Sequence, residues 1–177
     1  GYMLSTPLQL AVSTACIAQQ GKCFQPRLLK TRLSAGSSLG LNSSQETYQI
    51  ALSDEKNWER IITAMERVIT LPNGTASKAF QGVDYTVAGK TGTAHKIGKD
   101  GYADDRYLAY FAGIAPVTNP RLVTVVLIDE PRGNRYYGGE VAAPVFSRIT
   151  AGALRLLNVV PDQQQTLRGV AVPTLIL

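Results

Sequence analysis

The run Leu122-Val-Thr-Val-Val-Leu-Ile constrains the fold of this chain more than any other stretch of its sequence. Successive side chains of an extended strand point to opposite faces of a sheet, and in this run both sets are almost entirely apolar. A strand with one face in water alternates apolar and polar residues instead. The run therefore predicts a strand that is covered on both faces, so other elements have to pack on each side of its sheet.

Two further strand-like runs precede this one, Tyr85 to Ile97 and Tyr107 to Ala115. Asp100-Gly101 and Asn119-Pro120 supply the turn signals that separate the three runs. The sequence therefore predicts a meander of three antiparallel strands.

A helix is predicted over Ala143 to Leu157, and it is the natural cover for one face of that sheet. Arg148 and Arg155 are expected to point away from the sheet. The apolar residues at helical spacing, which should pack on it, are Val145, Ile149, Ala153 and Leu156.

The N-terminal half predicts further helices. Thr6-Pro7-Leu8-Gln9 supplies an N-cap, a proline at the first helical position and a glutamine at N3, so a helix should run to Gln20 and end at Gly21. Its expected apolar face is Leu8, Val12 and Ala15. A second helix, capped by Ser53 or Asp54 and ended by Leu71-Pro72-Asn73-Gly74, carries a wide apolar stripe of Trp58, Ile61, Ile62, Met65, Val68 and Ile69.

Three shorter segments complete the expected elements. Thr75 is predicted to cap a short helix to Phe80, Phe24 to Leu33 to form a short strand, and the Ser- and Gly-rich stretch Ser34 to Ser44 to form a loop. The expected fold class is α+β, an antiparallel sheet meander flanked by helices. Residues 1–158 are predicted to form one unit, and residues 159–177 a tail whose structure the pattern does not place.

Composition favours a globular chain, since 45% of the 177 residues are apolar and 18% are charged. The net charge of +5 comes from scattered residues, and no nucleic-acid motif accompanies it, so nucleic acid is not an expected partner. No apolar run is long enough to span a bilayer. The chain opens on Gly1-Tyr2-Met3 without a signal-peptide pattern, and we interpret it as an excised piece whose targeting segment lies elsewhere.

Neither a metal nor a cofactor is expected. Cys16 and Cys23 lack the paired spacing of a zinc site, and His95 has no ligand set near it. The two cysteines are interpreted as small core residues in preference to a disulfide, although an oxidising compartment would permit a bridge.

Lys90-Thr91-Gly92-Thr93 carries the strongest chemical signal, a cation, two hydroxyls and a glycine on one predicted strand. A phosphate-loop interpretation fails because Asp84 stands where that motif needs glycine and no helix pattern follows. Strand alternation sends Lys90 and Thr91 to opposite faces, so a pocket that both reach has to lie along the strand's edge. We hypothesise that an extended peptide lies antiparallel beside this edge, with the Thr93 amide aimed at a developing oxyanion.

The chain resembles the C-terminal part of the transpeptidase domain of class B penicillin-binding proteins, most closely the division-specific penicillin-binding protein 3 type. The stretches that carry the resemblance are Gly1-Tyr-Met-Leu-Ser-Thr-Pro-Leu-Gln-Leu, Ala88-Gly-Lys-Thr-Gly-Thr-Ala-His-Lys, Ala109-Tyr-Phe-Ala-Gly-Ile-Ala-Pro, Val125-Val-Leu-Ile-Asp-Glu-Pro and Tyr136-Tyr-Gly-Gly-Glu-Val-Ala-Ala-Pro-Val-Phe.

The resemblance implies a serine DD-transpeptidase, in which the serine of an S-x-x-K motif forms an acyl-enzyme with a peptidoglycan stem peptide and is acylated by β-lactams. Ser53-Asp54-Glu55-Lys56 is the one formal match, and we reject it as a helix-start segment. No serine has asparagine two positions later. The nucleophile, its lysine and the S-x-N triplet are therefore expected upstream of Gly1, and the chain alone is expected to be inactive.

The resemblance also assigns roles. Lys90 would tie into the upstream S-x-N triplet, Thr91 and Thr93 would hold the substrate carboxylate across Gly92, and the Thr93 amide would complete the oxyanion hole. Tyr136 and Tyr137 would form an aromatic wall, with ordinary loop packing as the alternative. His95 is interpreted as a solvated surface residue.

The expected partners are peptidoglycan stem peptides, β-lactam antibiotics and, by family resemblance, division proteins of the septal complex. The expected location is the periplasmic face of the bacterial inner membrane, with the anchor outside this chain. Two alternatives stay open. One is a serine β-lactamase or DD-carboxypeptidase, which shares the strand motif; the other is a non-catalytic module that binds peptidoglycan or a division protein.

Overall fold

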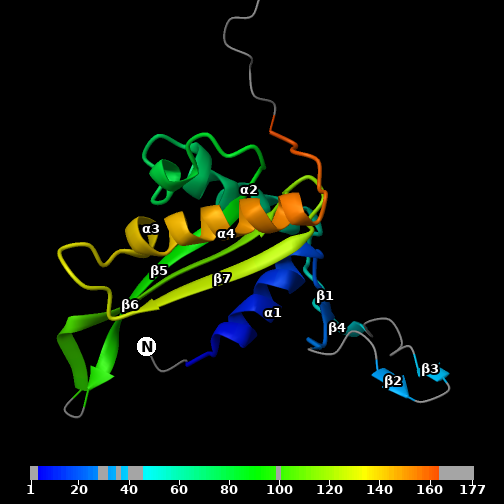
Figure 1. Cartoon of the computed structure of the whole chain (residues 1–177), viewed down its shortest axis with the longest axis horizontal. Coiled ribbons are helices and arrows are strands. Elements are labelled where there is room, and N and C mark those ends of the chain that lie inside the picture. Colours follow the sequence, from blue (N-terminus) through cyan, green and yellow to red (C-terminus); the bar gives the residue numbers. More distant parts are fainter. Residues whose placement is uncertain (1–3, 28–31, 35–36, 40–45, 99–100, 164–177) are drawn as a thin grey trace, which may run out of the picture.

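The computed structural model describes residues 4–27, 32–34, 37–39, 46–98 and 101–163 (Figure 1). Its main sheet has three antiparallel strands in the order β5 (Ala88–Gly98), β6 (Gly101–Ala115) and β7 (Leu122–Asp129). This is the meander that the sequence predicts. Three boundaries differ. Strand β5 begins at Ala88, three residues late, and it ends at Gly98 while β6 begins at Gly101, because the hairpin pairing continues to Gly98 opposite Gly101.

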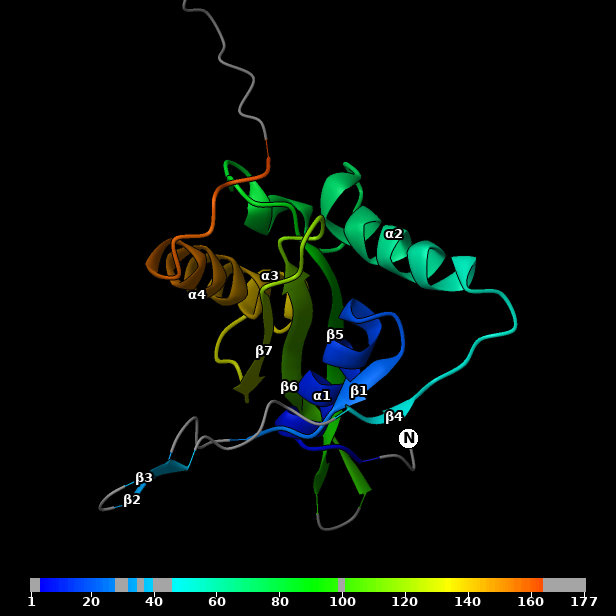
Figure 2. The same ribbon diagram turned by 90° about the vertical axis from the view of Figure 1, so that its right-hand side faces the viewer.

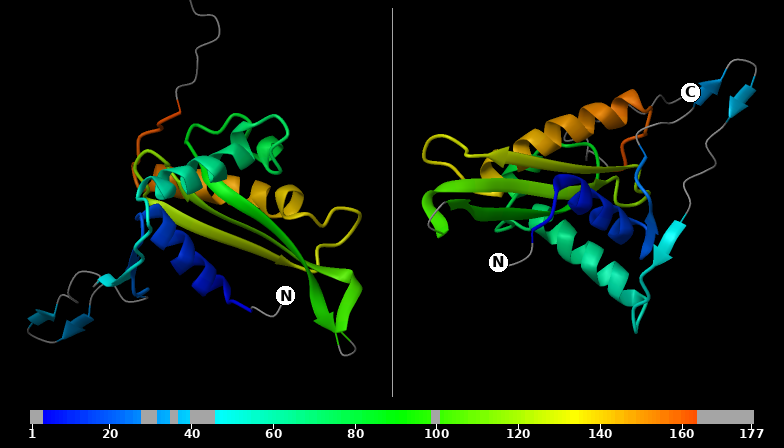
Figure 3. Two further views of the ribbon diagram at one scale, coloured as in Figure 1. Left: turned by 180° about the vertical axis from the view of Figure 1, so that it is seen from behind. Right: turned by 90° about the horizontal axis from the view of Figure 1, so that it is seen from below.

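Helices cover both faces of the sheet, as the apolar run in β7 requires. Helix α1 (Pro7–Ala18) packs on β6 and β7 from one side, and α4 (Ala143–Leu156) packs on the same strands from the other (Figure 2). The view from below in Figure 3 shows the sheet between α4 and the pair formed by α1 and α2 (Lys56–Thr70). The α+β class and the layered arrangement are confirmed.

Three phenylalanine rings fill the space between the sheet and α4. Phe111 of β6 lies 4.7 Å from Phe146 of α4 and 5.5 Å from Phe80, measured between ring centroids. Phe111 and Phe146 are fully buried. Phe80 belongs to the short 3₁₀ helix η1 (Ser77–Phe80), so this contact holds η1, β6 and α4 together.

The predicted packing face of α4 is wrong. Ile149 is 54% exposed and Leu156 is 86% exposed, whereas Phe146, Ser147, Thr150 and Leu154 are buried. The helix carries two apolar stripes. The stripe that contains Phe146 packs on the sheet, because the large aromatic ring buries more apolar surface. Thr150 tolerates burial since its hydroxyl bonds to that of Thr124 in β7, at 3.0 Å. The preceding short helix α3 (Gly138–Val141) leads into α4. Arg148 and Arg155 are exposed, as predicted.

The start of α1 confirms the predicted capping box. The Thr6 hydroxyl accepts from the Gln9 amide at 3.2 Å, and the Gln9 side chain accepts from the Thr6 amide at 2.8 Å. The helix ends at Ala18, two residues before the predicted end. Its predicted apolar face is partly wrong, because Leu8 is 58% exposed while Thr14 and Cys16 are buried.

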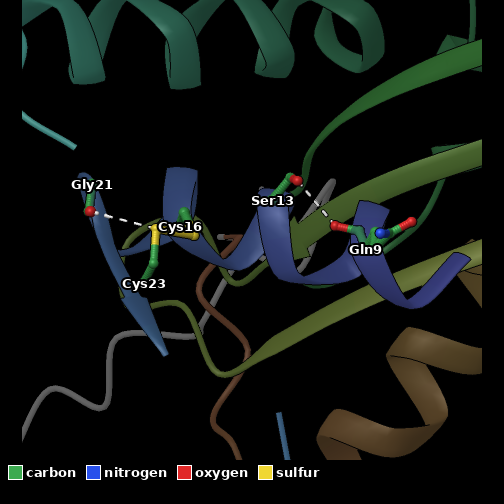
Figure 4. The surroundings of a disulfide bond; sticks show 5 residues. All are labelled: Gln9, Ser13, Cys16, Gly21 and Cys23. Atoms are coloured by element: carbon green, nitrogen blue, oxygen red, sulfur yellow. Dashed lines mark hydrogen bonds between the residues drawn. A yellow bond between two sulfur atoms is a disulfide. The ribbon is translucent and has the colours of Figure 1, made fainter. Parts of the chain in front are cut away.

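Cys16 and Cys23 form a disulfide, which corrects the interpretation of these residues as unpaired core side chains (Figure 4). Gly21, with φ of +94°, turns the chain back after α1 and brings the two Cα atoms within 4.7 Å. A Cβ at Gly21 would lie 2.5 Å from the Ile50 carbonyl oxygen and 2.8 Å from the Trp58 ring. Both cysteines are almost fully buried. Gly21 itself is the one sequence signal for this turn.

Short strands follow the disulfide. Strand β1 (Lys22–Phe24) pairs antiparallel with β4 (Glu46–Gln49), and β2 (Arg32–Ser34) pairs with β3 (Ser37–Leu39). The single strand predicted over Phe24 to Leu33 is therefore wrong, and the loop predicted over Ser34 to Ser44 is wrong at Ser37–Leu39, which form β3. Residues 28–31, 35–36 and 40–44 of those two predictions lie outside the described residues.

Two predicted helix caps also need correction. Helix α2 begins at Lys56, whose amide donates to the Asp54 carboxylate at 3.0 Å, so Asp54 supports the start from two positions before the helix. Thr75 does not cap η1, because its hydroxyl bonds to Thr91 instead. Helix α2 ends at Thr70 with Leu71 as its C-cap, so Leu71-Pro72-Asn73-Gly74 ends the helix as predicted. None of the described helices is long and apolar enough to cross a membrane.

An ion cluster ties the far ends of the three strands together. Lys96 of β5 donates to Asp129 and to Glu130 at 2.7 Å each, and Arg106 of β6 donates to Glu130. Hydrogen bonds from Arg106 and Lys96 hold the pKa of Glu130 at about 2, below its ordinary value of 4.5. The cluster fixes the end of β7 against the hairpin that carries β5.

The boundary predicted at residue 158 stays a prediction, and residues 164–177 lie outside the described residues.

The disulfide predicts a stability that depends on oxidation. Replacing Cys16 and Cys23 by alanine should lower the free energy of unfolding by roughly 2–3 kcal/mol, because the bridge restricts the unfolded chain. Denaturant titration of the oxidised protein and the double variant checks this value. A reducing agent should lower the free energy of unfolding of the wild type to that of the double variant, and it should leave the value for the double variant unchanged. Two titratable thiols in the unfolded, unreduced wild type would contradict the pairing.

The Glu130 cluster predicts a pH dependence on the acid side. Its folded pKa lies below its unfolded value, so the carboxylate stabilises the fold above about pH 4.5 and loses that effect as the pH falls towards 2. The melting temperature of Glu130→Gln should therefore lie below that of the wild type at pH 6 and converge with it near pH 2. Glu59→Gln on α2 is the charge-matched control. A difference that stays constant from pH 6 to pH 2 would contradict the assignment.

Candidate functional site

Strand β5 lies at one edge of the main sheet. It pairs with β6 along Ala88–Gly98 and has no second strand beside it among the described residues. The edge position is the one that the sequence predicts for Lys90-Thr91-Gly92-Thr93. An edge strand keeps backbone N–H and C=O groups available for an added extended chain.

Alternation along β5 places the motif side chains as expected. Thr91 pairs in register with Phe111, whose ring belongs to the core beneath α4, so Thr91 points to the α4 face. Its hydroxyl lies 3.0 Å from that of Thr75. Lys90 takes the opposite face and is exposed, with its ammonium donating to the Thr91 carbonyl at 2.9 Å. Thr93 shares the face of Thr91.

Thr93 also anchors the loop that follows β7. Its hydroxyl accepts from the Gly138 amide at 3.1 Å, which docks the start of α3 on β5. A Cβ at Gly138 would collide with the carbonyl oxygens of Gly92 and Tyr110, and one at Gly139 would collide with the Thr75 carbonyl. Glycine is therefore needed at both positions for this close backbone approach.

Gly92 is needed on the other side of the same contact. A Cβ there would overlap the ring of Tyr110 on the neighbouring strand. Gly138 thus lets α3 approach β5 and β6, Gly139 lets it approach the segment at Thr75, and Gly92 leaves room for the Tyr110 ring on the opposite face of the sheet. In the sequence, Thr91-Gly92-Thr93 and the pair Gly138-Gly139 are the signals for these close contacts.

Four aromatic rings form a stack beside Thr93. Tyr107 of β6 stacks on Tyr136 with centroids 4.1 Å apart and planes 13° apart, and Tyr136 lies 4.5 Å from Tyr137. The Tyr136 hydroxyl donates to the Tyr137 hydroxyl at 3.3 Å. His95 closes the other end of the stack, 4.6 Å from Tyr107. The rings of Tyr136 and Tyr137 are therefore in contact, and Tyr137 directly precedes the docked Gly138.

Tyr107 and Thr75 are the contacts that sequence reasoning missed. Tyr107 pairs with His95 in the β5–β6 register. The predicted meander would therefore have placed Tyr107 beside the motif strand if its register had been known. Thr75 comes from the segment before η1, and its contact with Thr91 had no sequence signal. His95 is exposed, as predicted, but its Nδ1 atom lies 2.8 Å from the Ala103 carbonyl and its ring contacts Tyr107.

Ser53 and Lys56, the rejected S-x-x-K match, do not form a nucleophile–base pair on a helix. Helix α2 begins at Lys56, so Ser53 precedes it and does not lie one helical turn below the lysine. Among the described residues, no group of three or more His, Cys, Asp or Glu side chains is placed to hold a metal ion. The structure brings together the edge strand that carries Lys90 to Thr93 and the aromatic stack of His95, Tyr107, Tyr136 and Tyr137.

Residues 1–151 match the family model of the penicillin binding protein transpeptidase domain. The chain is 37% identical over 164 residues to the peptidoglycan D,D-transpeptidase FtsI of Buchnera aphidicola subsp. Baizongia pistaciae, which covers 92% of this chain and 27% of that protein. It is 45% identical over 108 residues to FtsI of Escherichia coli K12, which covers 60% of this chain and 18% of that protein.

A solved structure gives the same result. The apo transpeptidase domain of Burkholderia pseudomallei penicillin-binding protein 3 superposes with a TM-score of 0.71 and 35% identity, over 93% of this chain and 46% of that domain. The chain thus spans about a quarter or less of these curated relatives and under half of that domain. It belongs to the penicillin-binding protein transpeptidase family and corresponds to the C-terminal part of the family's transpeptidase domain.

Proposed function

We propose that this chain is the substrate-gripping part of a peptidoglycan D,D-transpeptidase of the FtsI type. The observation that carries the proposal is the free edge of β5, where Lys90-Thr91-Gly92-Thr93 lies beside the docked Gly138 and the tyrosine stack. The names of the relatives support the reaction class. In this proposal a stem peptide pairs antiparallel with the edge of β5.

The hydroxyl groups of β5 suit a carboxylate. The Thr93 oxygen already accepts the Gly138 amide, so its own proton is free to donate to a ligand. Thr91 shares one hydrogen bond with Thr75 in which either hydroxyl can donate, and when Thr75 donates, the Thr91 proton is free as well. Both hydroxyls face the same side. The two hydroxyl donors would hold the terminal carboxylate of the peptide.

In the proposal, the reaction also needs catalytic groups from the part of the protein upstream of Gly1. These are the serine nucleophile, its lysine and the S-x-N triplet, and the Lys90 ammonium, which is exposed on the face opposite Thr91, would bind to the triplet. The Thr93 amide then stabilises the oxyanion that develops when the serine attacks the peptide or β-lactam carbonyl. Tyr136 and Tyr137 form the apolar wall beside the bound ligand.

The wider role follows the resemblance to division-specific members of the family. We place the full-length protein at the periplasmic face of the inner membrane, where it would cross-link septal peptidoglycan together with division proteins. A β-lactamase would hydrolyse the β-lactam acyl-enzyme rapidly and a DD-carboxypeptidase would transfer the peptide acyl group to water, whereas a transpeptidase would transfer that group to an amine. A non-catalytic binding module would show no upstream serine motif.

Covalent labelling with a fluorescent penicillin tests this proposal. The 177-residue chain alone should not be labelled, and the longer protein that includes the upstream serine should be labelled stoichiometrically. In the longer protein Lys90→Ala should slow labelling by about 10²-fold or more, as expected for loss of a group that acts on the reacting atoms. Lys22→Ala on β1 is the matched control and should label normally. Labelling of the short chain would show that the nucleophile is misplaced.

The glycine contact under the tyrosine stack gives a second test. Gly138→Ala should both destabilise the longer protein and slow its acylation, because the added Cβ would push α3 away from the carbonyl oxygens of Gly92 and Tyr110. Gly152→Ala in α4 is the control, since nothing lies within 4 Å of its Cβ position, and it should raise helix stability by up to about 1 kcal/mol. Melting temperature and labelling rate are the two measurements. Normal labelling of Gly138→Ala would argue against the docked loop as part of the site.

A further inference from the structure

The carboxylate of Asp162, in the segment after α4, accepts three hydrogen bonds from segments distant in sequence. Its Oδ1 atom accepts from the Thr86 amide at 2.7 Å, and its Oδ2 atom accepts from the hydroxyls of Thr86 at 2.5 Å and Thr118 at 2.6 Å. Thr86 lies just before β5, and Thr118 lies in the turn between β6 and β7. Burial alone would raise the pKa of Asp162, but the hydrogen bonds from Thr118 and Thr86 hold it below its ordinary value.

The Thr86 hydroxyl extends this arrangement. While donating to Asp162, it accepts from the Val117 amide at 2.9 Å in the same turn. One carboxylate and one hydroxyl thus connect the approach to β5, the β6–β7 turn and the segment after α4. Bonds to an ionised acceptor are stronger than bonds between neutral groups, so the charge of Asp162 is central to the connection.

Neighbouring bonds attach the same two segments to each other. The buried Tyr85 donates its hydroxyl proton to the Val159 carbonyl at 2.9 Å, and the Gln163 amide donates to the Asp84 carbonyl at 3.0 Å. Arg155 of α4 pairs with the Asp84 carboxylate at 3.0 Å. The segment from residue 159 to residue 163 therefore runs along the approach to β5 and takes the place of a strand partner there.

The attachment lies directly before the start of β5. The Thr86 amide donates to the Asp162 carboxylate two residues before the ladder with β6 begins, at Ala88 opposite Ile114. Lys90 follows Thr86 by four residues, which is roughly 13 Å along an extended strand. A strand transmits an axial shift along its length because its ladder is stiff, so the Asp162 contacts fix where the motif lies along the edge.

We propose that Asp162 is a positioning residue for the reaction on β5. It acts through Thr86 by setting the axial position of Lys90 and Thr93 against the nucleophile supplied from upstream. The inference rests on the proposed function. Displacement of a positioned group by about 1 Å can cost on the order of 10²-fold in rate, so loss of the carboxylate should slow the acylation step more than ligand binding.

The test uses the longer protein and measures β-lactam acylation over a range of concentrations, which separates the binding constant from the acylation rate constant. Asp162→Asn should lower the acylation rate constant by about tenfold or more and leave the binding constant within about twofold. Thr86→Val should give a similar loss, and the double variant should be no slower than the more affected single variant, because both changes break one connection. Asp105→Asn is the exposed, charge-matched control and should acylate normally.

Two further variants separate positioning from stability. Leu154→Ala removes a fully buried side chain of α4 and should lower the melting temperature at least as much as Asp162→Asn while keeping a normal acylation rate at 25 °C. Thr118→Val removes one of the three donors and gives a milder variant if Asp162→Asn does not fold. An acylation rate constant in Asp162→Asn or Thr118→Val equal to that of Leu154→Ala would overturn the inference. Absence of acylation in the wild type would instead refute the proposed function, and the inference with it.

Discussion

The pairing of β5 with β6 is the interaction on which the rest of the site depends. The ladder from Ala88 opposite Ile114 to His95 opposite Tyr107 holds β5 on one side, and no described strand pairs with its other edge. The same register puts Phe111 under Thr91, where Phe146 of α4 packs against it. The core thus supports the motif strand directly, and burial of the aromatic rings stabilises the position of the hydroxyl groups above them.

Strand patterns carried most of the fold that could be predicted from the sequence. Alternation in three runs and two turn signals gave the meander, and the run in β7, apolar on both faces, required the two covering layers formed by α1 and α4. The packing face of α4 could not be predicted because the helix has two apolar stripes, and only the position of Phe111 decides between them. The disulfide depended on a glycine turn whose direction the sequence does not encode locally.

The candidate site was predictable where its residues are consecutive. Lys90 to Thr93 form one strand, and Tyr136 to Gly139 form one loop, so a local pattern identifies each group. Contacts between segments were not predictable, since Thr75, Tyr107 and Asp162 reach the strand from three distant places in the chain. Their residue types are common on protein surfaces, and only the register and the path of the chain after α4 reveal their partners.

The three glycines around Thr93 also determine how this surface could evolve. Any side chain at Gly92, Gly138 or Gly139 meets a ring or a backbone carbonyl, so these positions offer almost no tolerated replacements. The exposed rings of Tyr137 and His95 and the partly exposed ring of Tyr136 carry no such restriction. In the proposed function, inherited changes in ligand preference would therefore fall on the aromatic side chains, while the backbone that presents them stays fixed.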